Sequence, residues 1–263
     1  MTTRWAYEAI AVEQFRSNKY MKPYFETDMM ISRYDWQSAY LVNELKRKSN
    51  EAVYTAGKAE YEDIYRNSLE KLRTHIGELS AETGLDPAQA MRVINREPFT
   101  QDASYIVNDY LDSLYKNIRR KYIYQTNVKD SITRVLVAKM GKEELLKLRT
   151  ETYNNDLAEI VLNRTVQKKF YETEHRIIQK ADPVLMMPDS RIGRAHFYAP
   201  YKMLGKLRIG TLWFNMSVIW FLNTILFVTL YLNVLKLLLN LLERIKIPGF
   251  GSDRLVPPWE MIK

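Results

Sequence analysis

One uncharged run near the C-terminal end dominates the hydrophobic pattern of this chain. Residues 212–235 read LWFNMSVIWFLNTILFVTLYLNVL and contain no Asp, Glu, Lys or Arg. A helix rises about 1.5 Å per residue and the hydrocarbon core of a bilayer is about 30 Å thick, so about 20 such residues cross it. The pattern predicts a single transmembrane helix within residues 209–243, preceded by a largely polar body.

The N-terminal segment has a different apolar pattern. Trp5, Ala9 and Val12 recur at helical spacing, and Arg4 and Glu8 lie off this stripe, which predicts an amphipathic helix within residues 1–18. A basic residue beside Trp5 suits a helix that lies in the lipid headgroup layer. A helix that packs its apolar side on the polar body has the same periodicity, and both positions remain open.

Helical periodicity continues through the rest of the body, interrupted by stop signals. Gly84 and Gly141 are suited to helix ends, Asp86-Pro87 to a helix start, and Asp182-Pro183 to a stop. The predicted helices cover residues 29–48, 51–79, 87–94, 101–126, 131–140 and 142–180.

No segment shows the alternation of apolar and polar residues that marks a strand. We therefore predict an all-α fold. An elongated helical domain over residues 19–182, with coiled-coil-like hairpins, is followed by an irregular connector over residues 183–208, the transmembrane helix and a short tail over residues 244–263.

The net charge of +8 raises the question of an anionic partner. Basic and acidic residues alternate along much of the chain, which is typical of solvated helix faces, and a basic excess also suits contact with anionic headgroups. The cluster Arg119, Arg120 and Lys121 is flanked by tyrosines but lies in no recognisable nucleic-acid module. We expect no nucleic-acid partner.

Few residue patterns in the chain suit catalysis. It has no cysteine and no GxxxxGK[ST] phosphate loop, and His75, His175 and His196 lie far apart in the sequence. We expect no catalytic residue, metal site or cofactor in this chain, and hence no enzyme activity of its own.

The predicted transmembrane helix has a polar side. Ser217, Thr224 and Tyr231 recur every seven residues, and amide side chains in lipid cost several kcal/mol unless they find partners. The pattern favours a helix that packs on other transmembrane helices or lines a pathway; the alternative is a tail anchor that tolerates these residues. The residues of this face are Asn215, Ser217, Asn223, Thr224, Tyr231 and Asn233.

The N-terminal segment also carries a family resemblance. Residues 4–10 read RWAYEAI, and Val12, Glu13, Gln14 and Phe15 follow. This string resembles the signature R-Y-A-F-E-A-L-x-x-N-E-F of G-subfamily (white-type, ABC-2) ABC transporters, with Glu13-Gln14 where the family has Asn-Glu. The matching positions include Arg4, Trp5, Tyr7, Glu8 and Phe15.

In that family, the signature lies in the external region between the fifth and sixth transmembrane helices, and the sixth helix ends the protein. The resemblance implies the C-terminal part of a bacterial permease with an enlarged extracytoplasmic loop, integral to the inner (cytoplasmic) membrane. It implies that the first five spans and the nucleotide-binding domain, which hydrolyses ATP, lie outside this chain.

The implied partners are the lipid bilayer, the other transmembrane helices and nucleotide-binding domain of the same transporter, and a second half-transporter in a dimer. The alternative function is a tail-anchored helical scaffold, whose cytoplasmic body binds partners through its tyrosine-rich faces.

Overall fold

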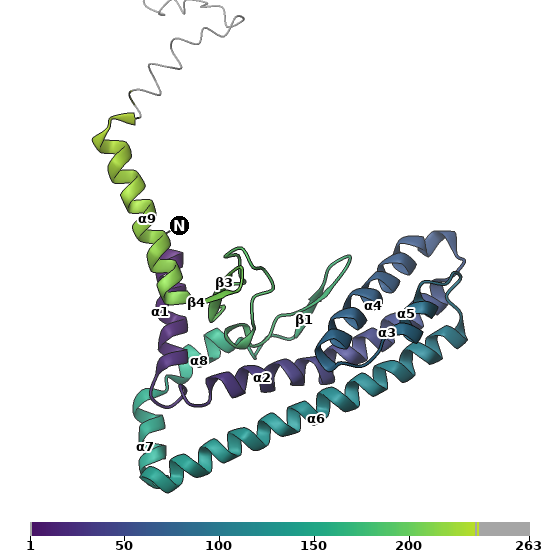
Figure 1. The fold of residues 1–263 in the computed structure, drawn as a ribbon, viewed down its shortest axis with the longest axis horizontal. Helices are drawn as coiled ribbons and strands as arrows, with labels where there is room; N and C mark the ends of the chain where they lie inside the picture. Colours follow the sequence, from purple (N-terminus) through teal and green to yellow (C-terminus); the bar gives the residue numbers. More distant parts are fainter. Residues whose placement is uncertain (1, 235, 237–263) are drawn as a thin grey trace, which may run out of the picture. The chain divides into compact units, whose positions relative to one another are not determined.

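The computed structural model describes residues 2–234 and 236. The chain forms two compact units, residues 1–216 and 217–263. The predicted fold class is confirmed: the described chain is mostly helical, with a long apolar helix on its C-terminal side (Figure 1). The elements are α1 (Thr2–Ser17), α2 (Phe25–Asp35), α3 (Val42–Thr55), α4 (Glu62–Thr83), α5 (Ala88–Ile94), α6 (Gln101–Met140), α7 (Lys142–Thr152), α8 (Asn155–Leu162), β1 (Phe170–Glu172), β2 (Ile177–Gln179), β3 (Tyr201–Leu204), β4 (Leu207–Gly210) and α9 (Thr211–Tyr231).

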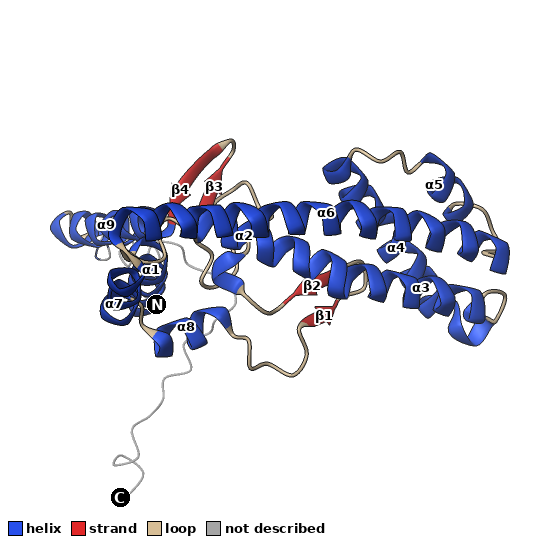
Figure 2. Cartoon of the chain, turned by 90° about the horizontal axis from the view of Figure 1, so that it is seen from below, coloured by secondary structure: helices blue, strands red, loops and turns tan. Residues whose placement is uncertain are grey.

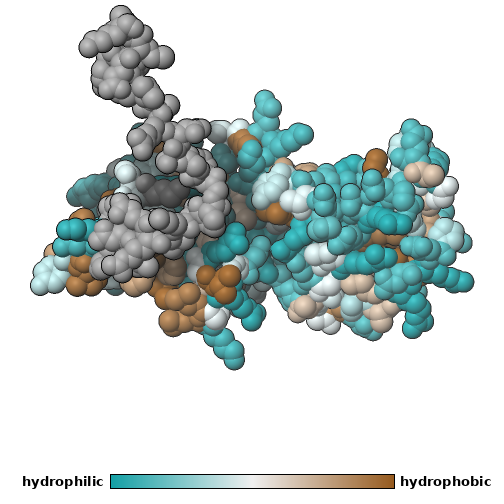
Figure 3. Space-filling view, turned by 90° about the horizontal axis from the view of Figure 1, so that it is seen from above, coloured by the Kyte–Doolittle hydropathy of each residue, from teal (hydrophilic) through white to brown (hydrophobic). Residues whose placement is uncertain are grey.

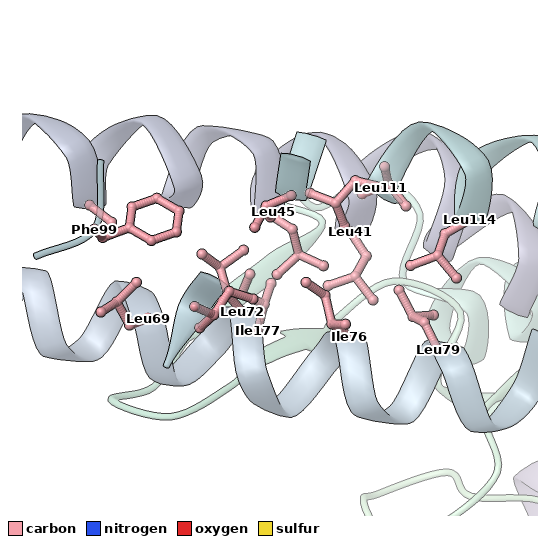
Figure 4. Packing of buried hydrophobic residues seen from close by; sticks show 14 of the residues in the cluster. Leu41, Leu45, Leu69, Leu72, Ile76, Leu79, Phe99, Leu111, Leu114 and Ile177 are labelled. Carbon is pink, nitrogen blue, oxygen red and sulfur yellow. The ribbon is translucent and has the colours of Figure 1, made fainter. Parts of the chain in front are cut away.

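The first hydrophobic core lies between α3, α4, α5 and α6. On α4, Leu69, Leu72, Ile76 and Leu79 recur at helical spacing and are at most 2 % exposed. Figure 4 shows these side chains pointing toward leucines of the neighbouring helices. Burying one such side chain stabilises a fold by about 1.5–3 kcal/mol, so this repeat accounts for the packing of α4. The face of this end of the body that is seen in Figure 3 is mostly hydrophilic.

The second core lies between α1, α2 and α8. Val12 and Phe15 of α1 are nearly fully buried against Phe25, Val161 and other apolar side chains. The face of α1 that the sequence left open between lipid and protein therefore packs on the body.

Helices α2 and α3 run on from each other through a π-helical turn over Trp36–Leu41. The predicted break near residue 50 is therefore misplaced. The observed break comes after Thr55, the last residue of α3. Gly57 lies in this break with a φ of +75°, a conformation that favours glycine. Helix α4 ends as predicted at Gly84, which is left-handed and donates its N–H to the Ser80 carbonyl.

Helix α6 is longer than predicted. It runs unbroken for 40 residues, about 60 Å, whereas the sequence suggested two helices separated near residue 128. That region has polar residues but no proline or glycine, so the backbone ladder continues. The predicted end at Gly141 is correct, since this residue has a φ of +88° and donates its N–H to the Val137 carbonyl.

The predicted helix over residues 142–180 is wrong. Helix α7 ends at Thr152, the Asn154 side chain accepts the N–H of Leu157 to start α8, and Asn163 ends α8 with a left-handed backbone. Asparagine side chains offer the backbone such local hydrogen bonds, which compete with helix continuation. Residues 170–179 then form the β1–β2 hairpin (Figure 2).

The connector over residues 183–208 is only partly irregular, because β3 and β4 form a second hairpin. Gly205 stands first in its two-residue loop with a φ of +59°. A positive φ at this position matches the type II′ turn, whose twist suits paired strands.

The β1–β2 hairpin is attached to the first core through polar contacts. The Glu172 carboxylate lies 2.8 Å from Lys48 Nζ and 3.0 Å from Lys71 Nζ, and the Ile177 N–H donates to His75 Nε2 at 2.9 Å. Partial burial alone would raise the pKa of Glu172, but the hydrogen bonds from the two lysines lower it to about 2. The carboxylate of Glu172 therefore stabilises the fold in its ionised form.

We expect Glu172→Gln to lower the free energy of unfolding by about 1–3 kcal/mol at neutral pH, because Lys71 loses its carboxylate partner. The folded-state pKa is depressed, so this contribution is present above about pH 4.5 and is lost as pH falls toward 2. Urea titrations of the full chain in detergent at several pH values measure it. Asp112→Asn, which breaks the exposed pair with Lys46, is the control; an equal loss in both variants would contradict the assignment.

Candidate functional site at the start of the apolar helix

A buried ion pair joins α1 to β3. Lys202 Nζ lies 2.9 Å from Glu8 Oε1, and both residues are only 6 % exposed. Glu8 lies one turn before the apolar residues of α1 that enter the second core. Lys202 lies on β3, in the β3–β4 hairpin. Because a buried charge is costly without a partner, each residue requires the other.

Asn215 of α9 completes this site. Its Nδ2 donates to Glu8 Oε2 at 2.9 Å and lies 3.0 Å from the carbonyl oxygen of Trp5. Asn215 is 1 % exposed, and its Oδ1 has no hydrogen-bond partner among the described residues. We refer to Glu8, Lys202 and Asn215 as the buried polar triad. It connects three segments that are far apart in the sequence.

Further contacts fix the first turn of α9. The Thr211 hydroxyl donates to the Ala199 carbonyl at 2.5 Å, and the Thr211 N–H donates to the Pro200 carbonyl at 3.2 Å. The Trp5 ring stacks on Phe214 with centroids 6.5 Å apart. The start of α9 is therefore held by both α1 and the segment before β3.

Cationic and aromatic side chains surround the triad. Arg4 lies over the Phe197 ring, 4.8 Å from its centroid. A cavity of about 280 Å³ beside them is lined by Arg4, Arg194, Trp5 and the triad, among others. Arg4 and Arg194 have no carboxylate within 4.0 Å in the described part of the chain, so their charges are available to an anionic group.

Tyr7 and Tyr198 flank the same region with their rings 6.4 Å apart, edge to face. Burial and a hydrogen bond with Tyr7 raise the pKa of Tyr198 to about 12. Tyr198 therefore stays neutral, and the ionic character of the site comes from Glu8, Lys202 and the arginines.

The structure brings together most of the signature residues. Arg4, Trp5, Tyr7 and Glu8 all lie at this site, while Phe15 packs in the second core against Phe25 and Tyr153. Of the polar residues assigned to one side of α9, Asn215 is buried against α1. The others have exposed side chains within the second unit: Ser217, Asn223, Thr224, Tyr231 and Asn233.

Helix α9 ends at Tyr231, within the predicted span over residues 209–243. Asn233 follows with a φ of +50°, and residues 235 and 237–243 of the predicted span lie outside the described residues, as does the predicted tail.

Lys202 was not among the predicted site residues. Its signal was present, because residues 201–210 read YKMLGKLRIG, in which polar residues alternate with apolar ones around a glycine. Reading this run as a hairpin would have placed Lys202 on a strand. It would not have identified Glu8 as its partner, since the two are 194 residues apart.

The histidines have separate roles. Burial lowers the pKa of His196, whose Nε2 lies 2.7 Å from the Pro183 carbonyl oxygen, and His175 pairs with Glu70 at the surface. Across residues 2–234 and 236, no group of three or more His, Asp or Glu side chains could hold a metal ion.

Comparison with known proteins gives no relative: the chain matches no protein-family model, no curated protein and no solved structure.

We expect Glu8→Gln to lower the free energy of unfolding of the full chain in detergent by about 3–5 kcal/mol, because Lys202 would remain buried without a counter-charge. The double variant Glu8→Leu, Lys202→Met removes both charges and should recover part of this loss. Glu26→Gln, which affects the exposed contacts of Glu26 with Arg208 and the Tyr201 hydroxyl, is the control and should cost less than about 1 kcal/mol. A cost for Glu8→Gln no larger than that of the control would contradict the buried pair.

Proposed function

We propose that this chain forms the C-terminal part of an ABC-2 type transporter permease, and contributes the last transmembrane helix and a large helical external domain to substrate export. The observation that carries the proposal is the position of Glu8. The acidic residue of the signature is buried and bound to both Lys202 and Asn215 at the start of the apolar helix. In the proposed permease, this role accounts for an acidic residue that lies off the stripe of Trp5 and Ala9 and is nevertheless buried near Val12.

The properties of α9 support a membrane position. It has 21 residues with a mean hydropathy of 1.6 over its most apolar window, and only 11 % of that window is buried. At 1.5 Å per residue it measures about 32 Å, close to the hydrocarbon thickness of a bilayer. Large exposed side chains such as Trp220, Leu226 and Phe227 need lipid or other helices around them. We place this helix in the inner membrane.

The side chains near the start of α9 suit the headgroup layer. Trp213 is 66 % exposed, and Arg4 and Arg194 lie near Trp5 at the cavity beside the triad. Tryptophan favours the membrane interface, and arginine attracts lipid phosphates. In this arrangement the triad couples the external domain to the helix at the level where the helix enters the bilayer.

In the proposed transporter, ATP hydrolysis belongs to a nucleotide-binding domain on another part of the polypeptide, and this chain has no catalytic role. The partners of α9 are the other transmembrane helices of the same half-transporter, which pairs with a second half. The external domain acts on gating or substrate release, since its movement is transmitted to α9 through the triad.

The tail-anchored scaffold remains the second candidate. The observation in its favour is the tyrosine-bearing surface of α6, where Tyr105 and Tyr124 are more than 60 % exposed. The two candidates differ in the location of the body, outside the cytoplasm in the transporter and inside it in the scaffold.

Photo-crosslinking in intact membranes tests the proposal. A crosslinking residue at Thr224, on the polar side of α9, should react with polypeptide, because that side faces other helices. The same residue at Leu226, two positions and about 200° around the helix, is the matched control and should react mainly with lipid. Lipid adducts at both positions would contradict a place in a helix bundle.

Cysteine labelling separates the two candidates by orientation. The chain has no cysteine, so Arg120→Cys on the body introduces a single thiol. A membrane-impermeant maleimide should label it before the inner membrane is permeabilised. Labelling only after permeabilisation would place the body in the cytoplasm and favour the scaffold.

A further inference from the structure

The net positive charge of the chain is concentrated in one segment. Residues 116–149, which we call the basic elbow, cover the C-terminal part of α6 and most of α7. They contain ten Lys and Arg against three Asp and Glu, a net charge of +7, compared with +8 for the whole chain. The basic residues are Lys116, Arg119, Arg120, Lys121, Lys129, Arg134, Lys139, Lys142, Lys147 and Arg149.

The elbow is not neutralised from within. Across the described residues, Lys129 is its one basic residue with a carboxylate within 4.0 Å, that of Asp28 at 2.6 Å. Arg119 and Arg149 instead lie against tyrosine rings, and Lys121 Nζ donates to the Glu82 carbonyl at 2.8 Å. The even alternation of charges noted in the sequence therefore does not extend to this segment.

An apolar row runs along α6 within the elbow. Tyr124, Val128, Ile132 and Val135 are spaced by four, four and three residues, and so share one side of the helix. Tyr124 and Val135 are 65 % and 66 % exposed, and with Pro23 the row lines a shallow groove of about 580 Å³. Val128 and Ile132 are partly exposed, so the row leaves an apolar surface that another molecule can cover.

Basic residues lie at both ends of this row. Arg120 precedes Tyr124 by four residues and Lys139 follows Val135 by four, so they continue the same side of the helix. Both are exposed. They are 19 residues apart, or about 28 Å along the helix axis. The groove thus presents an apolar centre with a positive charge at each end.

The elbow is remote from the start of α9. Thr133 of the elbow donates to the Tyr24 hydroxyl at 3.2 Å, just after α1, and Tyr153, just beyond the elbow, packs on Phe15 near the C-terminal end of α1. The start of α9 is held by Trp5 and Glu8, at the other end of α1, which is about 24 Å long. This length exceeds the Debye length of about 8 Å at physiological salt, so the charges of the elbow are screened from those at the start of α9.

We propose that the basic elbow is a docking site for an acidic protein segment, with an apolar centre flanked at both ends by Asp or Glu. Charge complementarity carries the choice of partner, since it both attracts such a segment and selects against basic ones. A second copy of the chain is a poor occupant, because a two-fold interface would bring two elbows of charge +7 together. The proposal uses the elbow alone and does not require transport activity.

The test uses the full chain in phosphatidylcholine nanodiscs and a fluorescent helical peptide of about 21 residues, with a leucine row and Glu on either side of it. We expect saturable binding that weakens as salt rises. Arg120→Glu with Lys139→Glu should weaken it at least tenfold, and Tyr124→Ser with Val135→Ser should also weaken it.

The matched control is Arg92→Glu with Arg96→Glu, which makes the same change in net charge at exposed residues at or beyond the end of α5. It should change the affinity less than twofold. Three results would each overturn the proposal. The acidic peptide does not bind, a peptide with Lys in place of Glu binds with the same affinity, or the control variant loses as much affinity as Arg120→Glu with Lys139→Glu. Phosphatidylglycerol vesicles and single-stranded DNA are tested in the same way. If either binds with higher affinity than the peptide, and Arg120→Glu with Lys139→Glu abolishes that binding, the elbow is a site for lipid or nucleic acid and the proposal is overturned.

Discussion

The buried contact of Glu8 with Lys202 and Asn215 is the constraint on which the arrangement of the body depends. Two opposite charges, each 6 % exposed, are stable inside a protein only when their geometry is fixed and their remaining hydrogen bonds are made. Here the carboxylate binds one group with each oxygen. The N-terminal helix, the β3–β4 hairpin and the first turns of α9 must therefore assemble together, although the sequence separates them by about 200 residues.

This constraint gives the two ends of α1 different roles. Its N-terminal end holds the start of the apolar helix, while Val12 and Phe15 pack in the second core, next to the segment on which the basic elbow rests. The start of α9 and the basic elbow are therefore supported by opposite ends of the same helix. The contacts that connect the elbow to the start of α9 run through α1 and the buried polar triad.

The sequence was most informative where a local pattern determines structure. The leucine and isoleucine repeat of α4 and the helix ends at Gly84 and Gly141 depend on neighbouring residues, and these predictions are confirmed. The uncharged run likewise forms the long apolar helix α9. The helix predicted over residues 142–180 failed because the side chain of Asn154 and the backbone of Asn163 make local contacts that helical periodicity does not register. Glu8 was selected by resemblance, but its partner Lys202 could not be, since no local pattern encodes a contact between positions so far apart. The net charge of +7 over residues 116–149 can be counted in the sequence, but the net charge of the whole chain does not show where the basic residues lie.

The most direct test of this account is a double-mutant cycle between Glu8 and Asn215, in which the unfolding free energies of Glu8→Gln, Asn215→Leu and the double variant are compared with that of the unmodified chain in detergent. If the body and the apolar helix share a buried hydrogen bond to a charged group, the coupling energy should be about 1.5–3 kcal/mol. Additive effects, with a coupling energy below about 0.5 kcal/mol, would show that the two residues are independent and would contradict the attachment of α9 to α1.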